Sequence, residues 1–366
     1  MKLAVTQENL SKALGLVSRV AGGSKTSLPV LQNVLVTAEK NSLKLSATNL
    51  EIAIRLTVGA KVEKEGSITV PARLTQDFIA SLPSGTIDLT LDATRLEVVT
   101  DNYKSVINGV PADEFPAIPE VKNDNQFSLE ASLLKNAISQ VVIAASHDET
   151  RPVLTGLWLH SHNKELFLVA TDSYRLAERC LGPIDQEVSL LIPVTAMQDV
   201  IRVLGDADEE VVIQFDEQQV SFKTGSVELT SRLIDGNYPD YRQLLPKQAS
   251  VSATLSRHDL ISITKVSSLF ARESAGSVTL EVDEAEQIVS IRSVASQVGE
   301  NSAKAPAKAV GDIEVALNSR YMLDALNVIE EAEVEFSSDG KTSPCIIKPA
   351  GKNATKYTHL IMPLRS

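Results

Sequence analysis

The chain has 366 residues, of which 4% are aromatic, and a formal net charge of −12. That length allows two or three domains, each large enough to bury a core of aliphatic side chains. The acidic total argues against a protein that wraps DNA over its whole surface, although the distribution of charge decides what a single face can bind. Two cysteines, Cys180 and Cys345, are too few for a disulfide framework or a zinc cluster and suit reduced thiols.

The N-terminal residues lack the apolar core of a signal peptide. No apolar run approaches the length that crosses a membrane. We therefore expect a soluble, cytoplasmic protein with no membrane partner.

A segment in the middle of the chain, ATDSYRLA at residues 170–177, organises the sequence because it recurs. Its upstream echo, ATNLEIA, begins at Ala47, 123 residues before Ala170. A fainter echo, VASQ, begins at Val294. A spacing this long indicates a repeated domain, because the units of a solenoid are far shorter.

Each third of the chain opens with apolar residues at the spacing of one helical face. The first two sets match closely and the third is looser. The positions are Leu10, Ala13, Leu14, Val17 and Ala21, then Leu134, Ala137, Ile138, Val141 and Ala145, then Leu260, Ile263, Val266 and Phe270.

Alternating apolar and polar residues follow the first helix and predict antiparallel strands with one solvated face. A second helix then begins at a residue type that suits a helix N-terminus. These residues are Pro71, Pro193 and Asn318. An aspartate recurs at one place in the three second helices, as Asp77, Asp199 and Asp324. Each third then returns to strands.

Polar, proline-containing stretches at 117–126 and about 241–252 join the thirds. We expect three domains, over residues 1–122, 126–247 and 250–366. Each would carry two helices on an antiparallel sheet, which is an α+β arrangement. A row of three similar domains can close into a ring when two chains join head to tail.

Four motifs on this threefold repeat carry a family resemblance: residues 70–73 (VPAR), 170–177, 235–241 (DGNYPDY) and 362–365 (MPLR). With them, the whole chain resembles the bacterial sliding clamps, the β subunits of DNA polymerase III. The resemblance implies a head-to-tail homodimer whose six domains form a ring around duplex DNA. Its partners would be double-stranded DNA, the polymerase III catalytic subunit, the clamp loader and other proteins with a clamp-binding motif.

The predicted helices carry more basic than acidic side chains although the chain is acidic overall. A mildly positive tunnel would attract phosphate without gripping it, and backbone contacts carry no sequence information. The alternative for each residue is a solvated helix face or polar loop. The residues that the helices and the resemblance together suggest for DNA binding are Lys12, Lys25, Arg73, Lys135, His147, Arg151, Arg202, Arg257 and Arg320.

The resemblance also implies a groove between the second and third domains that takes a short peptide from partner proteins. Apolar residues from distant stretches, with an adaptable methionine, can line such a groove. The alternative is that the aliphatic members are ordinary core residues. The matching positions are Leu154, Thr171, Ser173, Tyr174, Arg175, Leu176, Pro239, Gln243, Leu244, Leu360, Ile361, Met362, Pro363, Leu364 and Arg365.

The subunit interface of similar clamps joins the first domain of one chain to the third of the other. Leu269 and Phe270 match its apolar pair, facing Ile107 and its neighbours. An exposed apolar pair is costly unless a partner covers it. The alternative is a buried helix end in a monomer.

No residue set for catalysis stands out. His160 and His162 alternate on a strand as metal ligands could, but no carboxylate or thiolate lies nearby, so a solvated strand end is the better interpretation. The sequence lacks phosphate-binding glycine motifs and the clustered carboxylates of a two-metal nucleotidyltransferase. We expect a non-catalytic accessory subunit without metal or cofactor, in which nucleotidyl transfer belongs to the polymerase. The alternative function is a repeat-built peptide-binding scaffold that never encircles DNA.

Overall fold

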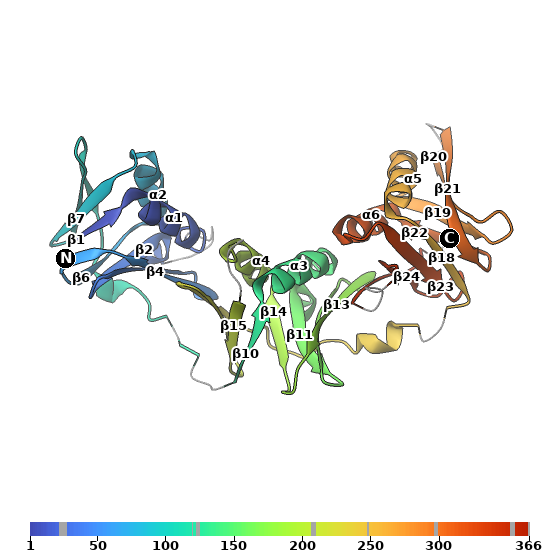
Figure 1. The fold of residues 1–366 in the computed structure, drawn as a ribbon, viewed down its shortest axis with the longest axis horizontal. Helices are drawn as coiled ribbons and strands as arrows, with labels where there is room; N and C mark the ends of the chain where they lie inside the picture. Colours follow the sequence, from blue (N-terminus) through green and yellow to red (C-terminus); the bar gives the residue numbers. More distant parts are fainter. Residues whose placement is uncertain are drawn as a thin grey trace. The chain divides into compact units, whose positions relative to one another are not determined.

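The computed structural model describes residues 1–21, 28–118, 120–121, 125–205, 210–246, 249–295, 299–351 and 356–364. Two compact units account for the chain. The first unit is Met1–Ser132 with Gln198–Leu233, and the second is Leu133–Met197 with Ile234–Ser366. Helices and antiparallel sheets make up both units, as the sequence predicts (Figure 1). The three domain boundaries expected from the repeat stay a prediction.

A helix is present at each of the six predicted places. None of the helices in the described part of the chain combines the length and apolar character needed to span a bilayer. The six helices are α1 (Gln7–Val17), α2 (Ala72–Ser81), α3 (Ala131–Val141), α4 (Val194–Val203), α5 (Arg257–Phe270) and α6 (Ser319–Val328).

The buried face of α5 differs from its predicted face. Val266 is 46% exposed, whereas Thr264 and Ser267 are buried. Small polar residues can occupy this face because their hydroxyls are satisfied: Thr264 donates to the Leu260 carbonyl (2.6 Å) and Ser267 hydrogen-bonds the Asn301 side chain (2.9 Å). The prediction from apolar spacing that Val266 is buried is therefore wrong.

Two antiparallel sheets form the first unit, with α1 and α2 packed against each other. The five-stranded sheet has the order β5-β1-β7-β8-β9, and the eight-stranded sheet has the order β10-β15-β16-β17-β4-β3-β2-β6. The bounds are β1 (Lys2–Thr6), β2 (Asn33–Glu39), β3 (Ser42–Thr48), β4 (Ile52–Gly59), β5 (Lys61–Lys64), β6 (Gly66–Pro71), β7 (Thr86–Asp92), β8 (Arg95–Val99), β9 (Lys104–Asn108), β10 (Gln126–Glu130), β15 (Glu210–Phe215), β16 (Gln219–Thr224) and β17 (Val227–Arg232).

One twelve-stranded antiparallel sheet runs through the second unit, in the order β14-β11-β12-β13-β25-β24-β23-β18-β21-β20-β19-β22. Helices α5 and α6, orange and red in Figure 1, pack against each other. The bounds are β11 (Gly156–His162), β12 (Glu165–Thr171), β13 (Arg175–Pro183), β14 (Ser189–Pro193), β18 (Val251–Ser256), β19 (Ser277–Asp283), β20 (Ile288–Ala295), β21 (Gly299–Val310), β22 (Ile313–Asn318), β23 (Glu333–Ser338), β24 (Cys345–Pro349) and β25 (Tyr357–Ile361).

The repeated motif forms the same loop in both units. In residues 171–175, the Thr171 hydroxyl donates to the Arg175 carbonyl (2.6 Å) and the Asp172 carboxylate accepts the Tyr174 amide (2.9 Å). In residues 48–52 a threonine and an asparagine make the matching bonds. The third residue of each loop has a φ of 77°. The repeat seen in the sequence is thus a repeat of backbone structure.

A stability prediction follows from the start of α6, where the Asn318 side chain accepts the amides of Arg320 and Tyr321. We expect Asn318→Ala to lower the free energy of unfolding by about 1 kcal/mol, because both amides lose their cap. The change would be measured by urea unfolding followed through Trp158, the single tryptophan, which lies in the same unit. Asn318→Asp keeps the acceptor and should stay near the wild type; an equal loss in both variants would contradict the capping role.

Candidate docking site and basic groove

Strand pairing brings the loop at residues 171–175, here called the docking loop, beside the C-terminal end of the chain. β13 pairs with β25 so that Arg175 lies opposite Ile361 and Leu176 opposite Leu360. The Met362 amide then donates to the Tyr174 carbonyl (2.8 Å). Segments far apart in the sequence thereby become one surface.

The residues predicted for the peptide groove divide by exposure. The buried members are Leu154, Thr171, Arg175, Leu176, Leu360 and Ile361. The half-buried members are Met362, Pro363 and Leu364, and the exposed members are Ser173, Tyr174, Pro239, Gln243 and Leu244. Arg365 lies outside the described residues. The exposed and half-buried residues are the ones able to touch a ligand, while the buried ones support them.

An aromatic cluster lies under this surface. Tyr241 and Phe167 are buried in it, and Trp158 stacks between His160 (ring centroids 3.8 Å apart) and Tyr238 (5.1 Å). Met362 packs against the cluster. Rigid rings under an adaptable methionine suit the binding of an apolar peptide side chain.

A buried polar network joins the segment that carries Gln243 and Leu244 to the sheet. The Tyr241 hydroxyl donates to the Glu178 carboxylate and lies 3.0 Å from His160 Nε2. Arg242 stacks over the ring of Phe167, 4.5 Å from its centroid, and its Nη2 lies 3.6 Å from Glu178. Burial raises the pKa of the Glu178 carboxyl.

The solvated strand end expected at His160 is wrong. The side chain is 4% exposed, and burial lowers its pKa to about 4, so the ring is neutral at pH 7. No local pattern predicts this burial, because Tyr241, whose ring lies edge-on to that of His160, is about 80 residues further along the chain. His162 is exposed, as expected.

Arg175 contacts two residues that the sequence did not suggest for this site. Its Nη1 lies 2.6 Å from Asp324 Oδ2 and its guanidinium stacks over the ring of Tyr321. Both residues lie on α6. The recurrence of aspartate in the three second helices was the available signal for Asp324.

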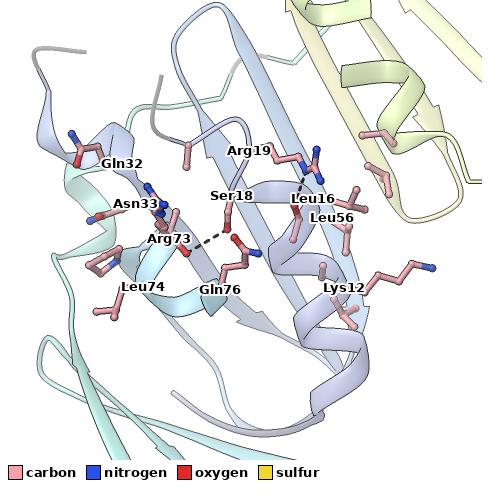
Figure 2. Close-up of a pocket in the computed structure, with 18 of the residues that line it drawn as sticks. Lys12, Leu16, Ser18, Arg19, Gln32, Asn33, Leu56, Arg73, Leu74 and Gln76 are labelled. Atoms are coloured by element: carbon pink, nitrogen blue, oxygen red, sulfur yellow. Dashed lines mark hydrogen bonds between the residues drawn. The ribbon is translucent and has the colours of Figure 1, made fainter. Parts of the chain in front are cut away.

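A groove of about 1800 Å³ in the first unit collects basic side chains (Figure 2). Three of the residues predicted to bind DNA line it: Lys12 on α1, Arg73 on α2 and Arg202. Arg19 lines it too and was not predicted. Two acidic residues, Asp77 and Glu114, temper the positive charge, which suits weak attraction of phosphate.

Of the remaining predicted DNA contacts, Lys25 lies outside the described residues, and the other five do not line this groove. Arg257 donates to the Leu326 carbonyl (3.1 Å), so part of its guanidinium caps the end of α6. Arg151 lies beside the docking loop, 3.4 Å from the Ser173 hydroxyl. The other three are the exposed His147 and Arg320 and the half-buried Lys135. A DNA role for each stays a prediction.

The predicted interface residues differ in exposure. Leu269, near the end of α5, is 55% exposed and Phe270 is half-buried. Ile107 is only 6% exposed, on the edge strand β9, whereas its neighbour Val106 is 42% exposed. Apolar surface is therefore present at both predicted ends of the interface, with Val106 rather than Ile107 presenting it on β9.

Among the residues described, no group of three or more histidines, cysteines, aspartates and glutamates could hold a metal ion. Hydrogen bonds, stacked rings and the ion pairs of Arg175 hold the side chains of the second unit in place.

Three family models match the chain in order: the N-terminal, central and C-terminal domains of the DNA polymerase III beta subunit, at residues 1–119, 128–240 and 242–365. The beta sliding clamp of Staphylococcus epidermidis is 33% identical over 356 residues, which is 93% of each chain.

Solved clamps share the whole fold. The Bacillus subtilis sliding clamp has a TM-score of 0.94 at 29% identity and covers 100% of this chain and 99% of its own. The Pseudomonas aeruginosa clamp has a TM-score of 0.94 at 27% identity, with all of both chains covered. These matches and the family models show that the chain belongs to the DNA polymerase III beta subunits, the bacterial sliding clamps.

Proposed function

We propose that this chain acts as a DNA sliding clamp. Two copies join head to tail, and their six domains, at residues 1–122, 126–247 and 250–366 of each copy, encircle duplex DNA in the cytoplasm. The observation that carries this proposal is the match of all three clamp domains, in order, over nearly the full chain. The ring has no catalysis of its own.

The clamp holds the replicative polymerase near its template by tethering it. A tether raises effective concentration without any new contact between enzyme and substrate. Sliding requires contacts with phosphate that are weak and carry no sequence information. The mixed charge of the groove that contains Lys12, Arg73 and Arg202 supports this mode of binding.

Partner proteins dock through a short peptide on the second unit. The polymerase catalytic subunit, the clamp loader and other DNA-processing proteins share this surface. The exposed Tyr174 and Leu244 and the half-buried Met362 support the proposal, because all three offer apolar area and Met362 packs against a rigid aromatic cluster.

The basic groove can be tested by salt dependence. Replacing Lys12, Arg73 and Arg202 together with alanine should weaken duplex binding and reduce the slope of log K against log salt by up to about 3, roughly 0.9 for each phosphate that is no longer neutralised. Binding to a labelled duplex would be titrated at several NaCl concentrations.

A matched control removes three exposed cations from β1 and β5 of the five-stranded sheet, Lys2, Lys61 and Lys64. Its slope should stay that of the wild type. Equal slopes for both triple variants would argue against the groove as a DNA-binding surface and leave the scaffold alternative standing.

The subunit interface can be tested by removing its apolar pair. Leu269→Ala with Phe270→Ala should raise the dimer dissociation constant by at least about a hundredfold, because burying each side chain contributes about 1.5–3 kcal/mol. Sedimentation velocity would show monomers, and the variant should leave circular DNA quickly. Leu74→Ala, an equally exposed leucine on α2, should remain dimeric. An unchanged dimer in the double variant would refute the assignment.

The docking surface can be tested at Leu244, which is 46% exposed and so contributes little to the core. Leu244→Ala should weaken binding of a labelled polymerase peptide about tenfold, since most of one buried leucine side chain is removed. Fluorescence anisotropy would measure the affinity. Leu50→Ala, at 50% exposure in the matching loop of the first unit, serves as the control. Equal affinity for both variants would exclude Leu244 from the site.

A further inference from the structure

The docking loop rests on a chain of charged contacts that begins on α6. Arg175 Nη1 lies 2.6 Å from Asp324 Oδ2, and Arg175 Nε lies 3.0 Å from Asp172 Oδ2. The other carboxylate oxygen of Asp172 accepts the backbone amide of Tyr174. The Tyr174 carbonyl in turn accepts the Met362 amide. Asp324 is thus connected, through these contacts, to two residues of the proposed peptide surface.

The same aspartate has different surroundings in the other two second helices. Asp199 on α4 pairs with Arg202 of its own helix (2.6 Å). Asp77 on α2 is exposed and lines the basic groove. Of the three, Asp324 is the one that binds an arginine from the repeated loop.

The matching loop in the first unit lacks the arginine. Its bonds within residues 48–52 match those of the docking loop, but the position of Arg175 is taken by Ile52, which is buried. An isoleucine offers no charge to an aspartate. The Arg175–Asp324 pair is therefore an addition to a loop whose backbone folds without it.

The backbone conformation of the docking loop needs support from surrounding contacts. Ser173 has a φ of 77°, a conformation that residues other than glycine rarely adopt and that surrounding contacts must hold. Arg175 is 10% exposed, so its ion pairs are only weakly screened by solvent. Removing one of the two carboxylates leaves a buried guanidinium partly uncompensated.

We propose that Asp324 is a positioning residue for partner docking: it holds the Arg175 guanidinium and thereby keeps the docking loop in the conformation that presents Tyr174 and Met362. This rests on the proposed peptide site. Asp324 itself does not touch the peptide. When the competent loop conformation is only partly populated, the apparent affinity falls by that fraction.

The experiment measures binding of a fluorescein-labelled peptide carrying the clamp-binding segment of a bacterial replicative polymerase to the full-length dimer. Asp324→Ala should weaken binding about tenfold, as expected for the removal of one charged hydrogen bond. Asp324→Asn, which keeps the shape, should weaken it less. Asp199→Ala, at the same place in α4, should bind as the wild type does.

A double-mutant cycle separates positioning from a general loss of structure. If Asp324 acts through Arg175, adding Asp324→Ala to Arg175→Ala should cause no further loss of affinity. Additive losses, or wild-type affinity in Asp324→Ala, would overturn the proposal while the peptide site stands. Failure of the wild-type protein to bind the peptide would overturn the peptide site and this proposal together.

Discussion

Pairing between edge strands is the constraint on which the rest of the structure depends. An unpaired edge leaves a row of backbone amides and carbonyls without partners. β4 meets that demand by pairing with β17, and β13 by pairing with β25. In both cases the bonds extend into the loop before the first strand, since the Arg232 amide donates to the Glu51 carbonyl and the Met362 amide donates to the Tyr174 carbonyl. Each pairing fixes a repeated loop against a distant segment.

The two pairings have the same backbone arrangement but carry different side chains. Beside β4 the partner strand ends in Ser231 and Arg232, whereas beside β13 it ends in Leu360 and Ile361 and is followed by Met362. The aromatic cluster around Tyr241 lies under the second pairing. The surface there supports the proposed docking of a peptide with apolar anchors, because burial of apolar area supplies most of the binding free energy.

Charge is unevenly distributed over the chain. The chain is acidic, yet basic side chains from α1 and α2 meet Arg202 in one groove of the first unit. The acidic Asp77 in the same groove limits the local potential. Weak, non-specific attraction lets a protein move along DNA, while a strongly basic groove would hold it in place. In the proposed function, the ring closed around DNA supplies the retention that the groove does not.

The sequence by itself determined the repeat, the positions of six helices and the family, because helical periodicity and the spacing of motifs are local properties of the chain. Tertiary structure alone decided which side chains meet. His160 is buried because the distant Tyr241 packs against it, and Arg175 is bound by Asp324 from a helix nearly 150 residues away. Val266 is exposed because Thr264 and Ser267, whose hydroxyls have hydrogen-bond partners, occupy the buried face of α5. Such contacts depend on strand register and long-range packing, which local spacing does not encode.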